Sequence, residues 1–344
     1  MLRREPGLAG ERAWAVGNGQ FPFLMKLLAA ARPLSLQVHP TREQAAAGHA
    51  REDAHGLSVA DPTRSYKDVN HKPEIIVAIT PFRALCGFRA PARSAEELRA
   101  LLGSDADAEA ARRLLTALDR ADEGAALEEA LVAILSPDTG MERVAETVVA
   151  AARHGDAPAG SSAETVRLVA DAYGADPGVL VALLLNRVDL LPGEALFLDA
   201  GHVHAYLSGL GLEAMATSDN VLRGGLTSKH VDVPGLVEIV SFAPAVPHRI
   251  TPVVSRADGV TVTSYAAPVP DFSVHVIDGE GGARTLEALT GPSVLVVTAG
   301  ALTFGVGEEE LVLPRGAAAF QAVGDPLRVL AGRGRAYLTT LGSA

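Results

Sequence analysis

The chain has 344 residues, of which 48% are hydrophobic, and this length predicts about two domains with at least one sizeable core. With 41 Asp and Glu against 30 Lys and Arg, the formal net charge is −11, so nucleic acid and membrane surfaces are not expected as partners, and an anionic substrate would need basic residues gathered locally. A single cysteine, Cys86, excludes an intramolecular disulfide and a cysteine-based zinc cage, while the lack of a long apolar run or a signal-peptide pattern predicts a cytoplasmic protein.

Short apolar runs broken by polar loops occupy residues 21–89. The segment LSLQVH at residues 34–39 alternates apolar and polar side chains up to Pro40, which predicts a half-buried strand. The segment IIVAI at residues 75–79 is a continuous β-branched run that Pro81 follows, and it predicts a buried strand.

Residues 94–186 are rich in Ala, Leu, Glu and Arg and predict several packed helices. Capping-box patterns beginning at Ser94 and Ser161 predict two helix starts, and Gly103 and Gly174 predict the corresponding ends. We find no metal-binding or nucleophile pattern here, so the segment is interpreted as scaffold.

Strands return after residue 190. Short apolar runs at residues 294–297, 302–304 and 311–313 are separated by glycine-containing turns, which predicts an antiparallel sandwich or barrel. Residues 191–198 and 313–320 both lead from a Pro and Gly turn into an apolar strand, which indicates a weak internal repeat of two related barrels or a chance similarity of turn chemistry.

Polar residues at the predicted strand ends form a candidate metal site. Gln37 and His39 leave one face of a strand, Glu74 opens the next strand, and His202 and His204 follow a Pro-Gly turn. One amide, two imidazoles and one carboxylate suit zinc or a similar first-row ion with an open position, and spacing alone does not decide between His202 and His204. The alternative is that these side chains cap strands at the surface.

A second polar cluster lies in a stretch rich in Gly and Ser, and its members are Glu213, Asp219, Asn220, Arg223 and Lys229. It would form a polar wall beside the metal or, alternatively, a solvated loop. Arg223 is the most informative residue, because the glycines that follow it allow close approach of the backbone and a guanidinium can bind an oxyanion or phosphate.

Together these segments resemble the type I phosphomannose isomerase family. The resemblance rests on long motifs between residue 21 and the C-terminus: LSLQVHP at 34–40, YKD at 66–68, NHKPE at 70–74, PGEA at 192–195, HAYL at 204–207, EAMA at 213–216 and SDNVLR at 218–223.

This resemblance implies a zinc-dependent enzyme, with one Zn²⁺ per chain, that interconverts mannose 6-phosphate and fructose 6-phosphate. The implied metal ligands are Gln37, His39, Glu74 and His204, the implied catalytic residues are Arg223, Lys72 and Glu213, and the residues expected to bind substrate are Ser35 and Lys229. The oligomeric state is left open, and a monomer is compatible with the sequence.

The implied fold is mainly β with a helical insertion. A cupin (jelly-roll) catalytic domain would comprise residues 1–93 and 187–249, a helical insertion domain residues 94–186, and a C-terminal β-barrel domain residues 250–344. The C-terminal segment, whose one histidine is His275, is expected to bind no metal and to bury apolar surface.

Three departures from the family pattern affect loops or strands rather than functional groups. Residues 1–20 lack the family's usual Trp-Gly and Glu-x-Trp motifs. Ser228 precedes Lys229, and Val203 precedes His204, at two positions where the family often has Pro. The barrel could therefore lack a strand or hold a replacement for it.

Aldose–ketose isomerisation through an enediolate needs an acid/base group near C1 and C2 and positive charge at the developing oxyanion. Arg223 and the metal would supply the charge, while Glu213, Lys72 or a zinc-bound hydroxide could each serve as base. Two alternatives stay open: a metal cupin with other chemistry, such as an oxygenase, and a sugar-phosphate-binding cupin with little activity.

Overall fold

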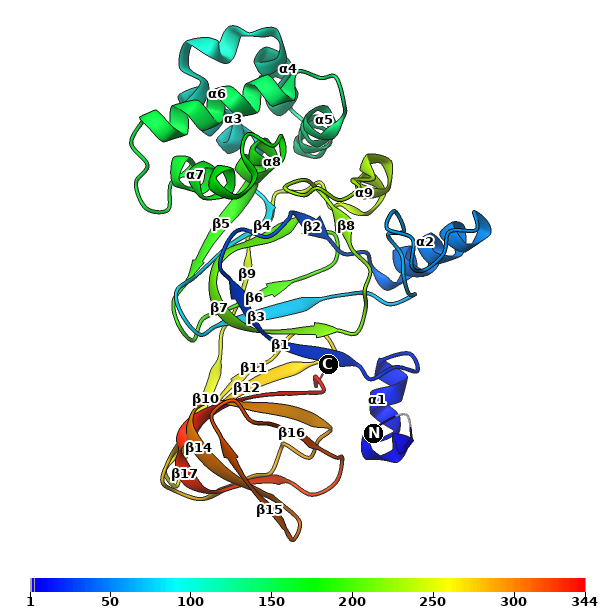
Figure 1. The fold of residues 1–344 in the computed structure, drawn as a ribbon, viewed down its shortest axis with the longest axis vertical. Coiled ribbons are helices and arrows are strands. Elements are labelled where there is room, and N and C mark those ends of the chain that lie inside the picture. The colour runs from blue at the N-terminus through cyan, green and yellow to red at the C-terminus, as the bar shows by residue number, and fades with distance from the viewer. Residues whose placement is uncertain (1, 3, 344) are drawn as a thin grey trace.

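The computed structural model describes residues 2 and 4–343, and it is mostly sheet with a helical portion, as the sequence predicted. Figure 1 shows an elongated molecule with the helices α3–α8 (residues 91–184) at one end, a curled half-barrel sheet in the middle and a second sheet at the other end. In the described part of the chain, no helix is both long and apolar enough to cross a membrane.

The middle sheet has nine strands and is antiparallel in every pairing, with the order β5-β4-β7-β3-β6-β9, while β1 and β2 also pair with β7, and β8 pairs with β2. Its strands are β1 (Phe23–Ala30), β2 (Gln37–Val38), β3 (Glu74–Ala78), β4 (Phe82–Phe88), β5 (Leu185–Leu190), β6 (Ala195–Leu198), β7 (His204–Ala216), β8 (Leu222–Arg223) and β9 (His248–Ile250).

The C-terminal sheet has eight strands in the order β10-β11-β12-β17-β14-β15, with β13 on β17 and β16 on β14. Its strands are β10 (Val253–Ala257), β11 (Val260–Tyr265), β12 (Ser273–Glu280), β13 (Arg284–Leu286), β14 (Ser293–Val306), β15 (Glu309–Pro314), β16 (Ala318–Gln321) and β17 (Leu327–Thr340). The two ring nitrogens of His275 lie 2.8 and 3.2 Å from the hydroxyls of Ser264 and Ser273.

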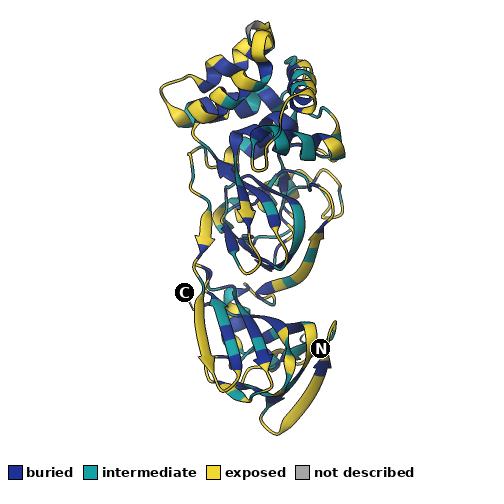
Figure 2. Ribbon diagram, turned by 90° about the vertical axis from the view of Figure 1, so that its left-hand side faces the viewer, coloured by how far each residue is buried: buried dark blue, intermediate teal, exposed yellow. Residues whose placement is uncertain are grey.

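Most helices lie between β4 and β5, and the others lie near the N-terminus, after β2 and before β9. Those of the first group are α3 (Pro91–Leu102), η2 (Gly103–Asp107), α4 (Glu109–Leu118), α5 (Glu123–Leu135), α6 (Met141–His154), α7 (Ser162–Tyr173) and α8 (Gly178–Leu184). The others are η1 (Pro6–Leu8), α1 (Glu11–Val16), α2 (Arg42–Ala54) and α9 (Val233–Ile239). Figure 2 shows that the grouped helices turn buried faces inward, and their apolar residues share one core with Leu36, Val38 and Leu207 of the middle sheet.

Strand β7 pairs with β1, β2, β3 and β4, and it carries an extra residue opposite β4. Arg83 pairs with Ser208 while Ala84 pairs with Tyr206, so a bulge changes which side chains face the interior. Before the bulge His204 and Tyr206 face inward, and after it Glu213 faces inward, opposite Ile76. The bulge therefore turns Glu213 toward the same interior as His204 and Tyr206, although regular alternation along the strand would place it on the opposite face.

Several predicted elements are confirmed and others are shifted. The strand predicted at residues 75–79 is β3, and Ser161 caps α7 as predicted, with its side chain accepting a hydrogen bond from the Glu164 N–H. The helix start predicted at Ser94 is wrong, because Pro91 already begins α3 and Ser94 is buried inside it. The runs at 294–297 and 302–304 belong to one continuous strand, β14, in which a bulge takes the place of a turn.

One apolar cluster joins the two sheets. From the middle sheet it contains Ile75, Val77 and Leu212, and from the C-terminal sheet Val274 and Tyr337, with others from both sides. The N-terminal segment contacts the C-terminal sheet as well, since the Val323 N–H donates to the Leu8 carbonyl at 2.9 Å. The two sheets therefore pack against each other through this shared apolar cluster.

Candidate metal centre

Two imidazoles and one carboxylate converge inside the middle sheet. His39 follows β2, Glu74 begins β3 and His204 begins β7, and each residue is at most 2% exposed. The His39 Nε2 lies 3.2 Å from Glu74 Oε1, and the His204 Nε2 lies 3.7 Å from Glu74 Oε2. The ligand atoms of the trio lie within 4.8 Å of one another, so one ion could contact all of them.

The hydrogen bonds of both histidines favour metal binding. The Nδ1 of His39 lies 2.8 Å from the Asn220 carbonyl oxygen, and the Nδ1 of His204 lies 3.0 Å from that of His202. A carbonyl can only accept, so each Nδ1 carries the proton and each Nε2 presents a lone pair to the interior. Among the described residues neither buried Nε2 has a hydrogen-bond partner, which is costly unless a ligand occupies the site. The residues therefore fit a zinc ion.

The pKa shifts of His204 and Glu74 also favour metal binding. Burial lowers the pKa of His204 to about 4, so its ring is neutral near pH 7, which is the form that binds metals. Although burial opposes ionisation of Glu74, Lys72 and His39 hold the pKa of that carboxyl well below its usual range. At neutral pH the trio thus offers the Glu74 carboxylate and the neutral imidazole of His204, with the ring of His39 beside them.

Strand register places Gln37 and Arg223 in the same row. Gln37 pairs with His204 on one side and with Arg223 on the other. Directly paired residues present their side chains on one face, and strands lie about 4.8 Å apart, so Arg223 is two strands from His204 with Gln37 between them. Arg223 Nη1 donates to the Ser35 hydroxyl at 2.7 Å.

Further polar side chains gather next to Glu74. Lys72 Nζ lies 3.1 Å from Glu74 Oε1, and the Tyr206 hydroxyl lies 3.5 Å from Glu74 Oε2. Glu213 is 4% exposed, and burial together with the Glu74 charge raises its pKa to about 8. Lys26 Nζ approaches Glu213 Oε2 to 3.8 Å. Glu213 thus lies buried on strand β7, which excludes the solvated loop that the sequence left open as an alternative.

A cavity of about 530 Å³ opens beside this row. Its lining includes Arg223 and Lys229, two of the residues expected to meet substrate, as well as Arg64 and Lys67. None of the three buried metal-binding candidates lines it, and Arg223 is the residue that belongs both to the cavity and to the row containing Gln37.

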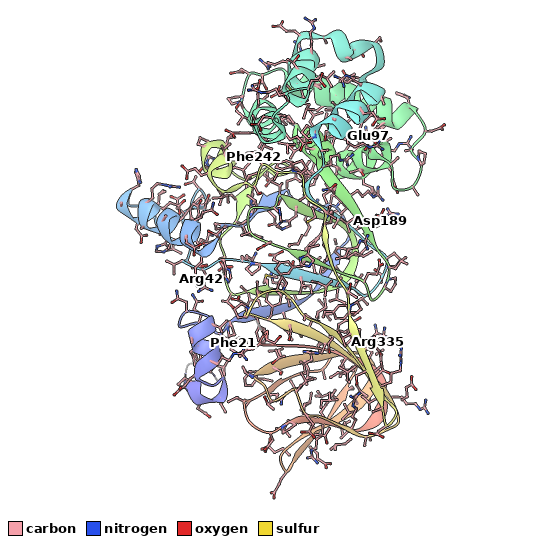
Figure 3. All side chains as sticks on the ribbon, turned by 180° about the vertical axis from the view of Figure 1, so that it is seen from behind. Phe21, Arg42, Glu97, Asp189, Phe242 and Arg335 are labelled. Atoms are coloured by element: carbon pink, nitrogen blue, oxygen red, sulfur yellow. The ribbon has the colours of Figure 1, made fainter. Side chains whose placement is uncertain are left out.

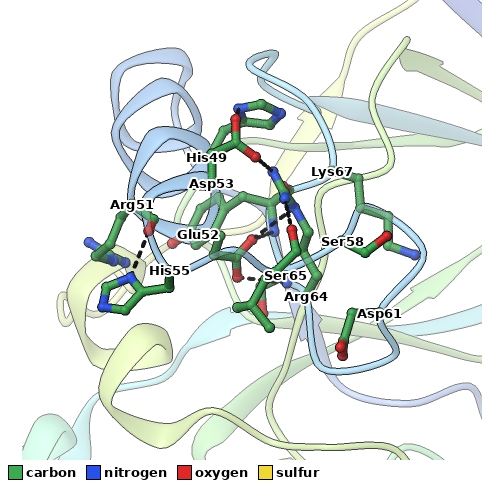
Figure 4. A network of polar contacts seen from close by, with 12 residues as sticks. His49, Arg51, Glu52, Asp53, His55, Ser58, Asp61, Arg64, Ser65 and Lys67 are labelled. Atoms are coloured by element: carbon green, nitrogen blue, oxygen red, sulfur yellow. Dashed lines mark hydrogen bonds and ion pairs between the residues drawn. The ribbon is translucent and has the colours of Figure 1, made fainter.

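A polar network holds the wall of this cavity against α2 (Figure 4). The carboxylate of Glu52 accepts hydrogen bonds from the backbone N–H groups of Ser65 and Tyr66, both at 2.9 Å. The buried Arg64 guanidinium pairs with Asp53 at 2.7 Å. These contacts fix the loop that carries Lys67.

Asn220 connects that loop to the metal-binding candidates. Its carbonyl contacts His39, while its side-chain oxygen accepts the N–H groups of Lys67 and Asp68 at 2.7 and 3.0 Å. Its side-chain nitrogen donates to the carbonyls of Asp68 and Asn70 at 2.8 and 2.9 Å. Asn220 thus orients a candidate ligand through its backbone.

The structure distinguishes the two histidines that spacing left equivalent. His204 belongs to the buried trio, whereas His202 lines a separate cavity of about 70 Å³ with His248 and Val246. Sequence reasoning did not identify Lys26, although it is the only charged residue within the apolar segment FLMKLLAA of β1, and that signal could have revealed it.

The chain is similar to known proteins along most of its length. Residues 6–91 match the model of the type I phosphomannose isomerase catalytic domain, and residues 265–309 match that of the type I C-terminal domain. Mannose-6-phosphate isomerase from Escherichia coli (strain K12) is 37% identical over 330 residues, covering 95% of this chain and 81% of that protein. The Bos taurus mannose-6-phosphate isomerase is 32% identical over 313 residues, covering 86% of this chain and 71% of the relative.

Solved structures are similar over nearly the whole chain. A lysine-to-alanine mutant of phosphomannose isomerase from Salmonella typhimurium superposes with a TM-score of 0.84 at 33% identity, covering 99% of this chain and 84% of that chain. A zinc-bound mannose 6-phosphate isomerase gives the same TM-score, identity and coverage.

Proposed function

This chain belongs to the type I phosphomannose isomerase family, and from this premise we propose that it interconverts mannose 6-phosphate and fructose 6-phosphate with the help of a bound zinc ion. The observation that carries the proposal is the buried trio, in which two imidazoles with bonded Nδ1 atoms direct free Nε2 lone pairs toward Glu74.

His39, Glu74 and His204 would hold the zinc ion, and Gln37 would add its amide oxygen as a fourth ligand. The register of Gln37 beside His204 supports this set. When bound, zinc supplies a Lewis acid that polarises a substrate oxygen. A set of four protein ligands that includes one neutral amide leaves room for substrate oxygens or water in an expanded coordination sphere.

Arg223 would stabilise the enediolate. Isomerisation moves a proton between C1 and C2, and negative charge develops on an oxygen as it does so. The Arg223 guanidinium lines the cavity, and Ser35 orients it at 2.7 Å. A fixed cation at that point stabilises the transition state more than the bound sugar.

Glu213 would move the proton. It faces the interior beside Tyr206 and Lys26, and its carboxyl group, with a pKa raised to about 8, can accept and return a proton near neutral pH. Lys72 is already paired with Glu74 at 3.1 Å, so we assign it to holding that carboxylate and donating to substrate oxygens.

The phosphate would bind in the cavity. Lys229 and Lys67 are exposed there, and Ser35 adds a hydroxyl at the Arg223 side. These cations give an acidic chain a local anion site, which accounts for a sugar phosphate as substrate despite the net charge of −11.

For the fold, we propose a cupin catalytic domain formed by residues 1–93 and 187–249, a helical insertion domain at 94–186 and a C-terminal barrel at 250–344. The curled middle sheet with its ligands at strand ends supports the cupin assignment. We also propose a cytoplasmic location, and a monomer is compatible with the sequence.

A coupled assay that follows conversion of mannose 6-phosphate to fructose 6-phosphate tests the function. The purified chain should be active, lose activity after dialysis against a chelator and regain it with added zinc. Binding of fructose 6-phosphate without turnover would instead identify a binding protein, and oxygen consumption would identify an oxygenase.

A further inference from the structure

A buried carboxylate of the C-terminal sheet reaches the metal-binding region. Asp271 lies between β11 and β12 and is 1% exposed. Both of its carboxylate oxygens lie 3.1 Å from the His71 Nε2, and its Oδ1 lies 3.8 Å from the Arg42 Nη2. A carboxylate this deeply buried is stable only with such partners, so these contacts fix its position.

The two partners flank two different candidate ligands. His71 lies three residues before Glu74 and is followed by Lys72, which pairs with Glu74 at 3.1 Å. Arg42 lies three residues after His39 and is the first residue of α2. Figure 3 shows Arg42 on the side of α2 that faces the C-terminal sheet. One carboxylate thus contacts both segments.

Metal binding is sensitive to the distance between these segments. Zinc holds its ligands at about 2.0–2.2 Å, and a workable site keeps each distance within about 0.2 Å. The segments of His39 and Glu74 come from different parts of the chain, so a shift of either changes the site. We propose that Asp271 is a positioning residue that keeps these two segments at the spacing zinc requires. The inference rests on the ligand set given under the proposed function.

This role assigns the C-terminal sheet a contribution beyond burying apolar surface. A purely structural contact between the sheets would change thermal stability and leave zinc affinity of the folded protein unchanged. A positioning contact would weaken zinc binding in a protein that is still folded, because the ligands would no longer be held at the required spacing.

The experiment measures the zinc dissociation constant of the full chain by competition with a chelating indicator, with far-UV circular dichroism to verify folding. Asp271→Ala should weaken zinc binding about 10–100-fold, as loss of a residue that orients metal ligands typically does. Asp271→Asn keeps an acceptor oxygen for His71 and should weaken it less. Asp278→Ala is the matched control, since Asp278 pairs with Arg335 in the same sheet at 2.6 Å and should leave zinc affinity unchanged.

A folded Asp271→Ala protein with wild-type zinc affinity overturns the inference. Should Asp271→Ala not fold, His71→Ala and Arg42→Ala remove the contacts from the other side, and unchanged affinity in both overturns it equally. If the wild-type chain binds no zinc, or if His39→Ala still binds it normally, the proposed function fails instead.

Discussion

Arg223 is placed so that its charge can act on a bound molecule rather than on the fold. Its hydrogen-bond partner is the neutral Ser35 hydroxyl, and burial lowers the pKa of its guanidinium without a carboxylate contributing to the shift. An arginine that is half-buried without an acidic partner has its charge available for an anionic ligand. Its removal should therefore affect catalysis more than stability.

Arg223→Ala should lower kcat by about 10²–10³-fold while zinc content stays at the wild-type level, because the charge is needed mainly as the enediolate forms. Steady-state kinetics and metal analysis of the purified variant test this. Arg249→Ala is the control, since Arg249 is exposed and pairs with Glu194. A near-normal kcat in Arg223→Ala would assign this residue to ordinary binding or to the surface.

His204→Ala should lose zinc, and His202→Ala should retain it. Removal of His204 leaves Gln37, His39 and Glu74, one of which is a weak neutral amide, so affinity should fall by more than the roughly 10–100-fold cost of losing an orienting residue. His202 contributes only its backbone carbonyl, which the substitution keeps. Zinc content of both variants is the measurement, and a depleted His202→Ala beside a replete His204→Ala would show that the wrong histidine was chosen.

Strand β7 shows how far local patterns predict this fold. The sequence predicted the turn before His204 and left Glu213 either in a polar wall beside the metal or in a solvated loop, and the strand in fact continues to Ala216. The inward direction of Glu213 depends on the bulge near Ser208, which is fixed by pairing with β4 and is invisible in the spacing of β7 itself. Long-range pairing, rather than local propensity, decides these features.

The same distinction applies to helices and to the site. Ser161 was predicted correctly as a cap because the cap is local, whereas Pro91 overrode the pattern at Ser94. Motif resemblance supplied His39, Glu74 and His204, which the structure brings together. Lys26 and Asp271 reach the site through sheet pairing and packing of distant segments. The lone charge of Lys26 in an apolar strand was a local signal, whereas nothing local located Asp271.

Substitution of Gly209 tests the geometry of strand β7. Its φ is +119°, and an added Cβ would lie 2.6 Å from the Pro81 carbonyl oxygen and 2.8 Å from the Phe82 Cα. Gly209→Ala should lower the free energy of unfolding by about 3 kcal/mol or more, since backbone strain and a clash with main-chain atoms combine. Gly316 also has a positive φ, +86°, but its Cβ would meet no atom within 4 Å, so Gly316→Ala should cost about 1 kcal/mol. Equal losses in urea unfolding would contradict the close approach at β7.

At the scale of the whole molecule, the core that joins the sheets should make them unfold together. Val274 of β12 is fully buried in that cluster beside residues of the middle sheet, whereas Val253 of β10 is 71% exposed. Trp14 fluorescence reports on the C-terminal side, because the adjacent N-terminal segment bonds to Val323, and zinc release reports on the middle sheet. A single transition with both probes is expected, since neither sheet can expose the shared apolar surface alone.

Val274→Ala should lower the free energy of unfolding by about 2–3 kcal/mol, which combines lost burial with a cavity, and it should shift the urea midpoints of both probes equally. Val253→Ala makes the same chemical change at an exposed position of the same sheet and should shift neither midpoint measurably. If Val274→Ala moves the Trp14 transition while zinc release keeps its wild-type midpoint, the C-terminal sheet is an independent unit. In that case the contacts of Asp271 would be too weak to link the stabilities of the two sheets. A carboxylate that fixes both ligand segments should make those segments unfold together with the loop that carries it.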